Sequence, residues 1–165
     1  MKLDLPLVLV DASVMLSLFY NEESRIAAVS ALLNKHGESL LIAFPALQQL
    51  ETLAPGKLER EGVELGTREA HYAEARRFIE SQSYFSVDLN EAIALNAGAH
   101  WSKVIEKRND MALFAAAEYY GATALYTYDG KLVRRVTQNG KVKPPFFLGQ
   151  PPAPAISSDT DTLPF

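Results

Sequence analysis

The chain has 165 residues and a mass of 18.2 kDa, close to the size of one ordinary domain, which argues against two independent catalytic domains. It contains no cysteine, so disulfide frameworks, thiolate metal sites and cysteine nucleophiles are excluded. Its 16 basic and 20 acidic residues give a formal net charge of −4, which disfavours binding of nucleic acid through the overall charge alone.

The first predicted elements are a buried strand and two helices. Residues 5–10 read LPLVLV, a nearly continuous apolar run typical of a strand covered on both faces. Apolar residues at helical spacing then predict a short helix after Asp11 and a second helix over 22–35, which ends before Gly37.

The middle of the chain repeats this alternation. Residues 39–44 predict a second buried strand, and a helix over 45–54 contains Glu51. A partly exposed helix over 67–81 then leads to a short strand over 84–88.

Two helices and a strand complete the predicted core. Residues 89–108 predict a helix that Gly98 weakens. Asp110 begins an alanine-rich helix, and the strand that follows over 122–128 ends just before Asp129.

This order of elements predicts an α/β fold, a three-layer α/β/α sandwich with a mainly parallel central sheet. We expect it to occupy residues 1–140, because six of the nine prolines lie in residues 141–165. Residues 146–148 there have the composition of a short edge strand, and the remainder reads as a proline-rich tail without a core of its own.

A cytoplasmic location and no membrane association are expected. No apolar run approaches the roughly 18 residues that a membrane span needs. Asp4 also lies where a secretory signal would be apolar.

Four acidic residues are predicted to meet at one edge of the sheet, where ligands bind in open parallel α/β folds. Asp11 and Asp129 each follow a strand, Asp110 opens a helix, and Glu51 lies on the helix that leaves the second strand. Carboxylates placed together repel one another unless a cation offsets the repulsion. Hard cations such as Mg²⁺ or Mn²⁺ take oxygen ligands, so a shared divalent metal ion is the natural occupant.

Each acid also has a purely structural interpretation. Asp11 and Asp110 are acceptable helix N-caps, Asp129 suits an Asp-Gly turn, and Glu51 suits an exposed helix position. The metal-site hypothesis therefore depends on all four acids lying at one edge.

A basic run without any acid extends from residue 131 to residue 143. Its members are Lys131, Arg134, Arg135, Lys141 and Lys143. A solvated surface and a local phosphate-binding patch are both open interpretations of this run.

Three segments together form a recognisable pattern: LVLVDASVMLSLFYNEE, the acid inside FPALQQLETLA, and RNDMALFAAAEYYGATALYTYDGKL. The pattern resembles the PIN-domain ribonucleases, and most closely the VapC-like toxins of toxin–antitoxin pairs. The resemblance covers about residues 7–136. It implies a PIN-like nuclease domain and a metal-dependent endoribonuclease that leaves a 5′-phosphate and a 3′-hydroxyl.

The resemblance also implies which residues act. The catalytic and metal-binding quartet would be Asp11, Glu51, Asp110 and Asp129, with supporting hydroxyls at Ser13 and Thr127 and RNA-binding residues at Lys131, Arg134 and Arg135. The implied cofactor is Mg²⁺ or Mn²⁺, and no organic cofactor is expected.

Partners implied by the resemblance are an RNA substrate, a cognate antitoxin protein and a second copy of the chain. The antitoxin would cover the acidic pocket. Met15, Phe19 and Tyr20 in the first helical pair are candidate contact residues, although core packing would use the same side chains.

Two alternative functions remain open at this stage. A catalytically silent PIN fold would serve as a binding scaffold. An aspartyl-phosphate phosphatase would use a similar sheet, but its motif requires a second acid at position 13, which is Ser13 in this sequence.

Overall fold

The computed structural model describes residues 5–19, 22–53, 65–81 and 84–154. Within them the chain forms one five-stranded sheet in the order β3-β2-β1-β4-β5, and every neighbouring pair is parallel. The strands are β1 (Leu7–Val10), β2 (Leu41–Pro45), β3 (Phe85–Val87), β4 (Ala124–Tyr126) and β5 (Phe147–Gly149). The predicted parallel sheet is therefore confirmed.

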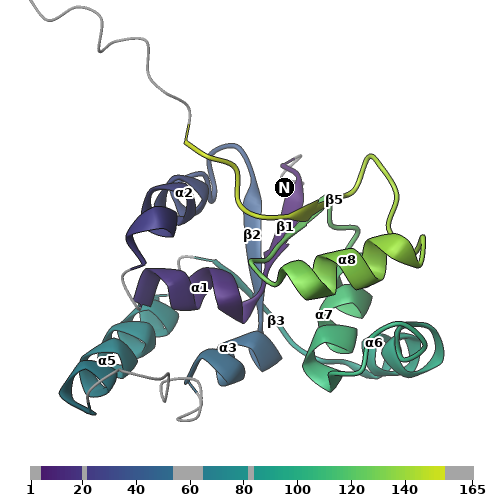
Figure 1. The fold of residues 1–165 in the computed structure, drawn as a ribbon, viewed down its shortest axis with the longest axis horizontal. Helices are drawn as coiled ribbons and strands as arrows, with labels where there is room; N and C mark the ends of the chain where they lie inside the picture. Colours follow the sequence, from purple (N-terminus) through teal and green to yellow (C-terminus); the bar gives the residue numbers. More distant parts are fainter. Residues whose placement is uncertain (1–4, 20–21, 54–64, 82–83, 155–165) are drawn as a thin grey trace, which may run out of the picture.

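Helices connect the strands and cover the sheet (Figure 1). In chain order they are α1 (Ala12–Phe19), α2 (Glu23–Leu33), α3 (Ala46–Leu53), α5 (Leu65–Ser81), α6 (Glu91–Asn96), the π-helix η1 (Ala97–Trp101), α7 (Arg108–Tyr119) and α8 (Gly130–Gln138). None of these helices is long and apolar enough to cross a bilayer.

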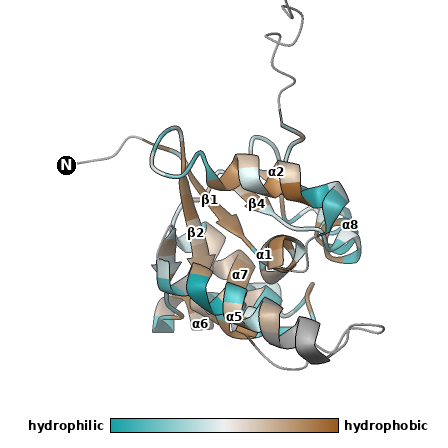
Figure 2. Cartoon of the chain, turned by 90° about the vertical axis from the view of Figure 1, so that its left-hand side faces the viewer, coloured by the Kyte–Doolittle hydropathy of each residue, from teal (hydrophilic) through white to brown (hydrophobic). Residues whose placement is uncertain are grey.

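Successive side chains of the central strands point to opposite faces and build two cores. Val8 and Ile42 pack with residues of α1, α2 and α5, whereas Leu9, Ala43 and Leu125 pack with residues of α6, η1, α7 and α8. Strands β1 and β2 are hydrophobic along their length, as a sheet covered on both faces requires (Figure 2). The architecture is the predicted three-layer α/β/α sandwich.

The predicted helix over 89–108 is wrong in its second half. Helix α6 ends at Asn96, and a π-helical turn follows in which Ser102 N donates to Ala97 O at 3.0 Å. This wider turn buries Trp101 in the core, where it stacks on Phe114. Packing of a large aromatic side chain therefore overrides the local helical pattern.

Two smaller expectations also need correction. Helix α7 begins at Arg108, so Asp110 lies in its first turn instead of opening it. Met15 and Phe19 are only 0% and 1% exposed, so they serve the core and are not available as contact residues, and Tyr20 lies outside the described residues.

The predicted edge strand is present as β5. It pairs with β4, and Val142, Phe146 and Leu148 pack against the core that contains α7 and α8. The last part of the predicted tail, residues 155–165, lies outside the described residues.

Candidate active site

Asp11 directly follows β1 and is held in place by several hydrogen-bond donors. Its side chain is buried, and its Oδ1 atom accepts from Ser13 N at 2.9 Å and from Ser13 Oγ at 2.5 Å. Its Oδ2 atom accepts from Thr127 Oγ1 at 2.5 Å. Asp11 thus caps the start of α1 and, at the same time, is fixed by the hydroxyl groups of Ser13 and Thr127.

The protonation of Asp11 reflects two opposing effects. Burial raises its pKa and the hydrogen bonds from Ser13 and Thr127 lower it, which leaves the pKa at about 6. The carboxylate therefore lies in an environment that disfavours its charge, yet it is surrounded by donors that orient it.

The ends of β1 and β4 are joined by the same hydroxyl groups. Tyr128 N donates to Ser13 Oγ at 2.9 Å, and Asp129 N donates to Thr127 Oγ1 at 3.0 Å. The side chain of Asp129 accepts from Leu132 N at 3.1 Å, so it caps α8. The structure brings Asp11, Ser13, Thr127 and Asp129 together, as the sequence predicts.

Tyr128 is supported from a neighbouring helix. The guanidinium carbon of Arg25 lies 4.1 Å from the centre of the Tyr128 ring, and Arg25 also pairs with Glu22 at 3.2 Å. Neither Arg25 nor Tyr128 is predicted from the sequence, because their contact joins two distant segments without a local motif.

The pKa of Asp110 is affected by the charges of the other three acids. Burial and, to a smaller extent, the negative charges of Asp11, Glu51 and Asp129 together raise its pKa to about 6, against a lowering effect of Lys107. An acid responds in this way only when the other carboxylates share its surroundings. The charges of the other three predicted acids therefore all reach Asp110.

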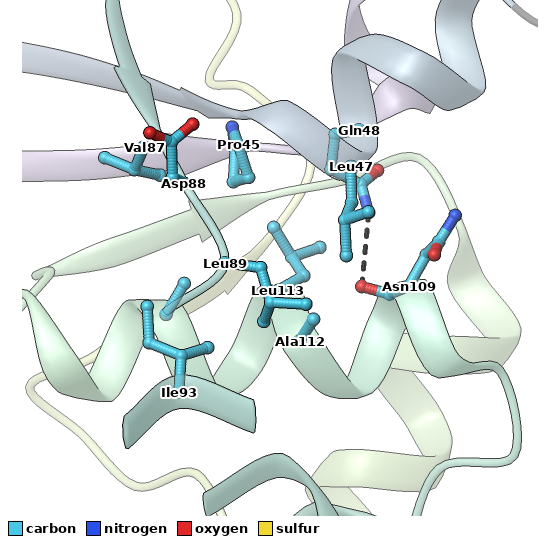
Figure 3. Close-up of a pocket in the computed structure, with 11 residues that line it drawn as sticks. Pro45, Leu47, Gln48, Val87, Asp88, Leu89, Ile93, Asn109, Ala112 and Leu113 are labelled. Atoms are coloured by element: carbon cyan, nitrogen blue, oxygen red, sulfur yellow. Dashed lines mark hydrogen bonds between the residues drawn. The ribbon is translucent and has the colours of Figure 1, made fainter. Parts of the chain in front are cut away.

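Gln48 connects the helices that carry these acids. It is 1% exposed, its Oε1 accepts from Ala12 N at 2.8 Å, and its Nε2 donates to Asn109 O at 3.4 Å. Figure 3 shows this side chain of α3 pointing toward the start of α7. The apolar pocket drawn there has a volume of about 10 Å³, too small for anything larger than a water molecule.

A cleft of about 150 Å³ opens beside Asp110 and Asp129. Lys107, Lys131 and Arg135 line it together with the two acids. Two of the three predicted RNA-binding residues thus border the cleft, whereas Arg134 is exposed and does not line it. Lys107 was not predicted, although it lies one helical turn before Asp110.

Residues 8–137 of the sequence match the PIN domain family. The chain belongs to this family. No curated protein sequence gives a significant match.

Solved structures with the same fold as this PIN domain include VapC toxins. VapC20 of Mycobacterium tuberculosis, described as a toxin that cleaves the sarcin-ricin loop, has a TM-score of 0.58 at 17% identity, over 77% of this chain and 93% of that one. VapBC-1 of nontypeable Haemophilus influenzae has a TM-score of 0.56 at 17% identity, over 87% and 96%. A toxin–antitoxin complex from Klebsiella pneumoniae has a TM-score of 0.53 at 18% identity, over 75% and 88%.

The donor atoms of this PIN domain suit a hard divalent cation. Among the described residues, no three carboxylate or imidazole groups stand close enough to form a ready-made metal cluster. The acids are nevertheless near enough to raise the pKa of Asp110, and a bound cation would offset that repulsion. Carboxylate oxygens are the preferred ligands of Mg²⁺ and Mn²⁺, so the residues fit the ion chemically.

Proposed function

We propose that this PIN domain is a metal-dependent endoribonuclease and acts as the toxin of a toxin–antitoxin pair. The observation that carries the proposal is the placement of the acids in a PIN fold: Asp110 and Asp129 border one cleft, and the charges of Asp11 and Glu51 also reach Asp110. Such a group of mutually repelling carboxylates is costly to maintain without a cation to bind.

Each acid has a proposed role. Asp11 and Asp129 would be direct metal ligands, Asp110 a shared ligand, and Glu51 either a ligand or a base that accepts a proton from the attacking water. Bound Mg²⁺ or Mn²⁺ would activate that water and stabilise charge on the leaving oxygen. Hydrolysis would leave a 5′-phosphate and a 3′-hydroxyl.

The remaining polar residues position these groups and the RNA. Ser13 and Thr127 hold both carboxylate oxygens of Asp11, so the carboxylate keeps one orientation. Lys107, Lys131 and Arg135 border the cleft beside Asp110 and Asp129, where they can hold phosphates of the RNA on either side of the scissile bond. Arg134 would add a phosphate contact outside the cleft.

Cleavage of a structured RNA mixture, with and without Mg²⁺ or Mn²⁺, tests the activity. We expect metal-dependent products with 5′-phosphates from the native chain, none from Asp11→Asn, and unchanged cleavage by Asp88→Asn, whose acid is exposed and outside the cleft. Mn²⁺ should raise the melting temperature of the native chain and of Asp88→Asn but not of Asp11→Asn. Absence of both cleavage and metal-dependent stabilisation would replace the proposal with the binding scaffold.

The proposed partners follow from the relatives, because two of the similar structures are described as VapBC or toxin–antitoxin assemblies. We propose that an antitoxin covers the cleft, that the chain forms a homodimer, and that it acts in the cytoplasm. A strict monomer at micromolar concentration in light-scattering measurements would refute the homodimer. Full cleavage by the chain while a small protein partner is bound over the cleft would refute an inhibitory antitoxin.

A further inference from the structure

A second and larger cavity lies away from the acidic cleft. Its volume is about 330 Å³, and it is bordered by the second half of α7, the π-helix η1 and the segment between α8 and β5. The proposed hydrolysis uses none of its residues. The apolar part of its lining includes Trp101, Phe114, Val142 and Phe146, and the charged part consists of Glu118, Lys141 and Lys143.

Trp101 and Phe114 form the floor of this cavity. Their rings stack with centres 4.8 Å apart, and the two side chains are only 2% and 1% exposed. The Nε1 atom of Trp101 is buried and has no hydrogen-bond partner among the described residues. The π-helical turn that places Trp101 here is a departure from regular helix of the kind that is frequent at functional sites.

The rim of the cavity is basic. Lys141 and Lys143 are exposed and make no ion pair within the described part of the chain, and the Lys141 ammonium lies 5.7 Å from the centre of the Trp101 ring. Half-buried Phe146 and Val142 provide an apolar wall between the floor and the rim. A flat ring attached to a phosphate would match this arrangement, because the half-buried Val142 and Phe146 offer it apolar contact and the two lysines offer its phosphate a cation.

Glu118 makes the cavity suited to a nucleobase more than to a simple anion. One of its oxygens, Oε2, accepts from Asn96 Nδ2 at 2.7 Å, which orients the carboxylate. A carboxylate repels phosphate but accepts hydrogen bonds from the N–H groups on the edge of a base.

The cavity and the acidic cleft are joined by two helices. Asp110 borders the cleft and Ala117 borders the cavity, and a separation of seven positions along α7 corresponds to about 10 Å. The basic run begins at the cleft with Lys131 and Arg135 and continues to the cavity with Lys141 and Lys143. Positive side chains thus border both hollows, although the net charge of the chain is −4.

We propose that this cavity binds a base of the RNA substrate a short distance along the strand from the scissile phosphate, with Lys141 and Lys143 on adjacent phosphates. This inference rests on the proposed ribonuclease function and defines its substrate as a single-stranded segment that reaches from the cleft to the cavity. It gives the enzyme a means to select RNA at a position remote from the chemistry.

Trp101 is the only tryptophan in the chain, so its fluorescence reports directly on this cavity. The probe is a set of single-stranded RNA octamers added to the intact chain in EDTA, which prevents cleavage. We expect saturable quenching, weakened about tenfold in the double variant Lys141→Gln and Lys143→Gln. The matched control is Lys35→Gln with Lys103→Gln, since both lysines are exposed and line neither the cleft nor the cavity.

Cleavage assays with added Mn²⁺ separate failure of this inference from failure of the proposed function. If the native chain cleaves RNA but no octamer quenches Trp101, or if both double variants bind equally, the cavity is not an RNA site and the inference is overturned. Equal quenching by an acidic peptide of the same charge would also overturn it, in favour of a protein partner. If the cavity binds a base, the lysine double variant should raise KM for the octamer that quenches best, and the control pair should not.

Discussion

At the scale of single residues, the site depends on the fixed orientation of the Asp11 carboxylate. Ser13 donates a hydrogen bond to one carboxylate oxygen of Asp11, and Thr127 donates one to the other. The same two hydroxyl groups accept hydrogen bonds from the backbone N–H groups of Tyr128 and Asp129. The side chain is buried, so these donors stand in for water. Ser13 and Thr127 therefore orient the Asp11 carboxylate and hold the backbone that follows β4 in place.

Thr127→Val is the sharpest test of this arrangement, because valine has the same shape and lacks the hydroxyl. It leaves Asp11 Oδ2 without a donor and Asp129 N without an acceptor, which should cost about 1–3 kcal/mol of stability and lower cleavage about 10–100-fold. Thr123→Val is the control, since Thr123 is exposed and its hydroxyl group donates a hydrogen bond to Leu7 O, away from the acids. Melting curves and cleavage rates that are equal for the two variants would contradict the role of Thr127.

Asp110 predicts a specific dependence of stability on pH. Its pKa in the folded chain is about 6, above the ordinary 3.8, so the unfolded chain ionises first as pH rises. Without metal, this group therefore has no effect below about pH 4, destabilises the fold progressively between about pH 4 and 6, and imposes a constant penalty above.

Asp110→Asn should remove that penalty. In EDTA at pH 7.5 we expect the variant to be more stable than the native chain by about 1 kcal/mol, a value reduced for the partial exposure of the side chain, and the difference should disappear by pH 4. Urea unfolding at several pH values measures it, with Asp88→Asn as the exposed control. A variant less stable than the native chain at pH 7.5 would show that burial and the neighbouring charges do not penalise the ionised Asp110.

At the scale of elements, the sequence predicts what depends on local pattern and misses what depends on long-range contacts. Strands β1 and β2 are recognisable as apolar runs, and the parallel order of strands puts Asp11 and Asp129 at the same edge of the sheet, after β1 and β4. The helix predicted over 89–108 is wrong in its second half, because the burial of Trp101 determines the backbone geometry after Asn96. Gln48 cannot be found by pattern, since its partners lie 36 and 61 residues away.

Substitution of Gln48 tests how α1, α3 and α7 are held relative to one another. It joins the start of α1, just after Asp11, to the start of α7, just before Asp110, from a position one turn before Glu51. Gln48→Met keeps the volume and removes both hydrogen bonds, and we expect a loss of about 1–3 kcal/mol in stability together with weaker Mn²⁺ stabilisation. Gln138→Met, at an exposed position, should change neither quantity. Unchanged Mn²⁺ stabilisation in Gln48→Met would restrict this residue to a role in packing.

At the scale of the whole molecule, the two helical layers differ in what they contribute to the surface of the protein. The layer of α1, α2 and α5 closes one core, whereas the layer of α6, α7 and α8 closes the other and carries both the cleft and the second cavity. The basic side chains that line these two hollows come from the residue before α7, from α8 and from the segment after α8. A chain with net negative charge can thus present a local positive surface beside an acidic centre.

Strand β5, in the proline-rich last part of the chain, is hydrogen-bonded to Thr127 of the site. Although it lies after residue 140, Thr127 N donates to Gly149 O at 2.8 Å, and Phe147 N donates to Thr123 O at 3.1 Å. Truncation after Gly140 removes both partners and the half-buried Val142, Phe146 and Leu148, which should cost at least about 3 kcal/mol and abolish cleavage. Truncation after Pro154 leaves every one of these contacts, so its melting temperature and cleavage should equal those of the full chain. Equal stability of the two truncated chains would mean that the domain ends at residue 140 and that β5 contributes nothing to the fold.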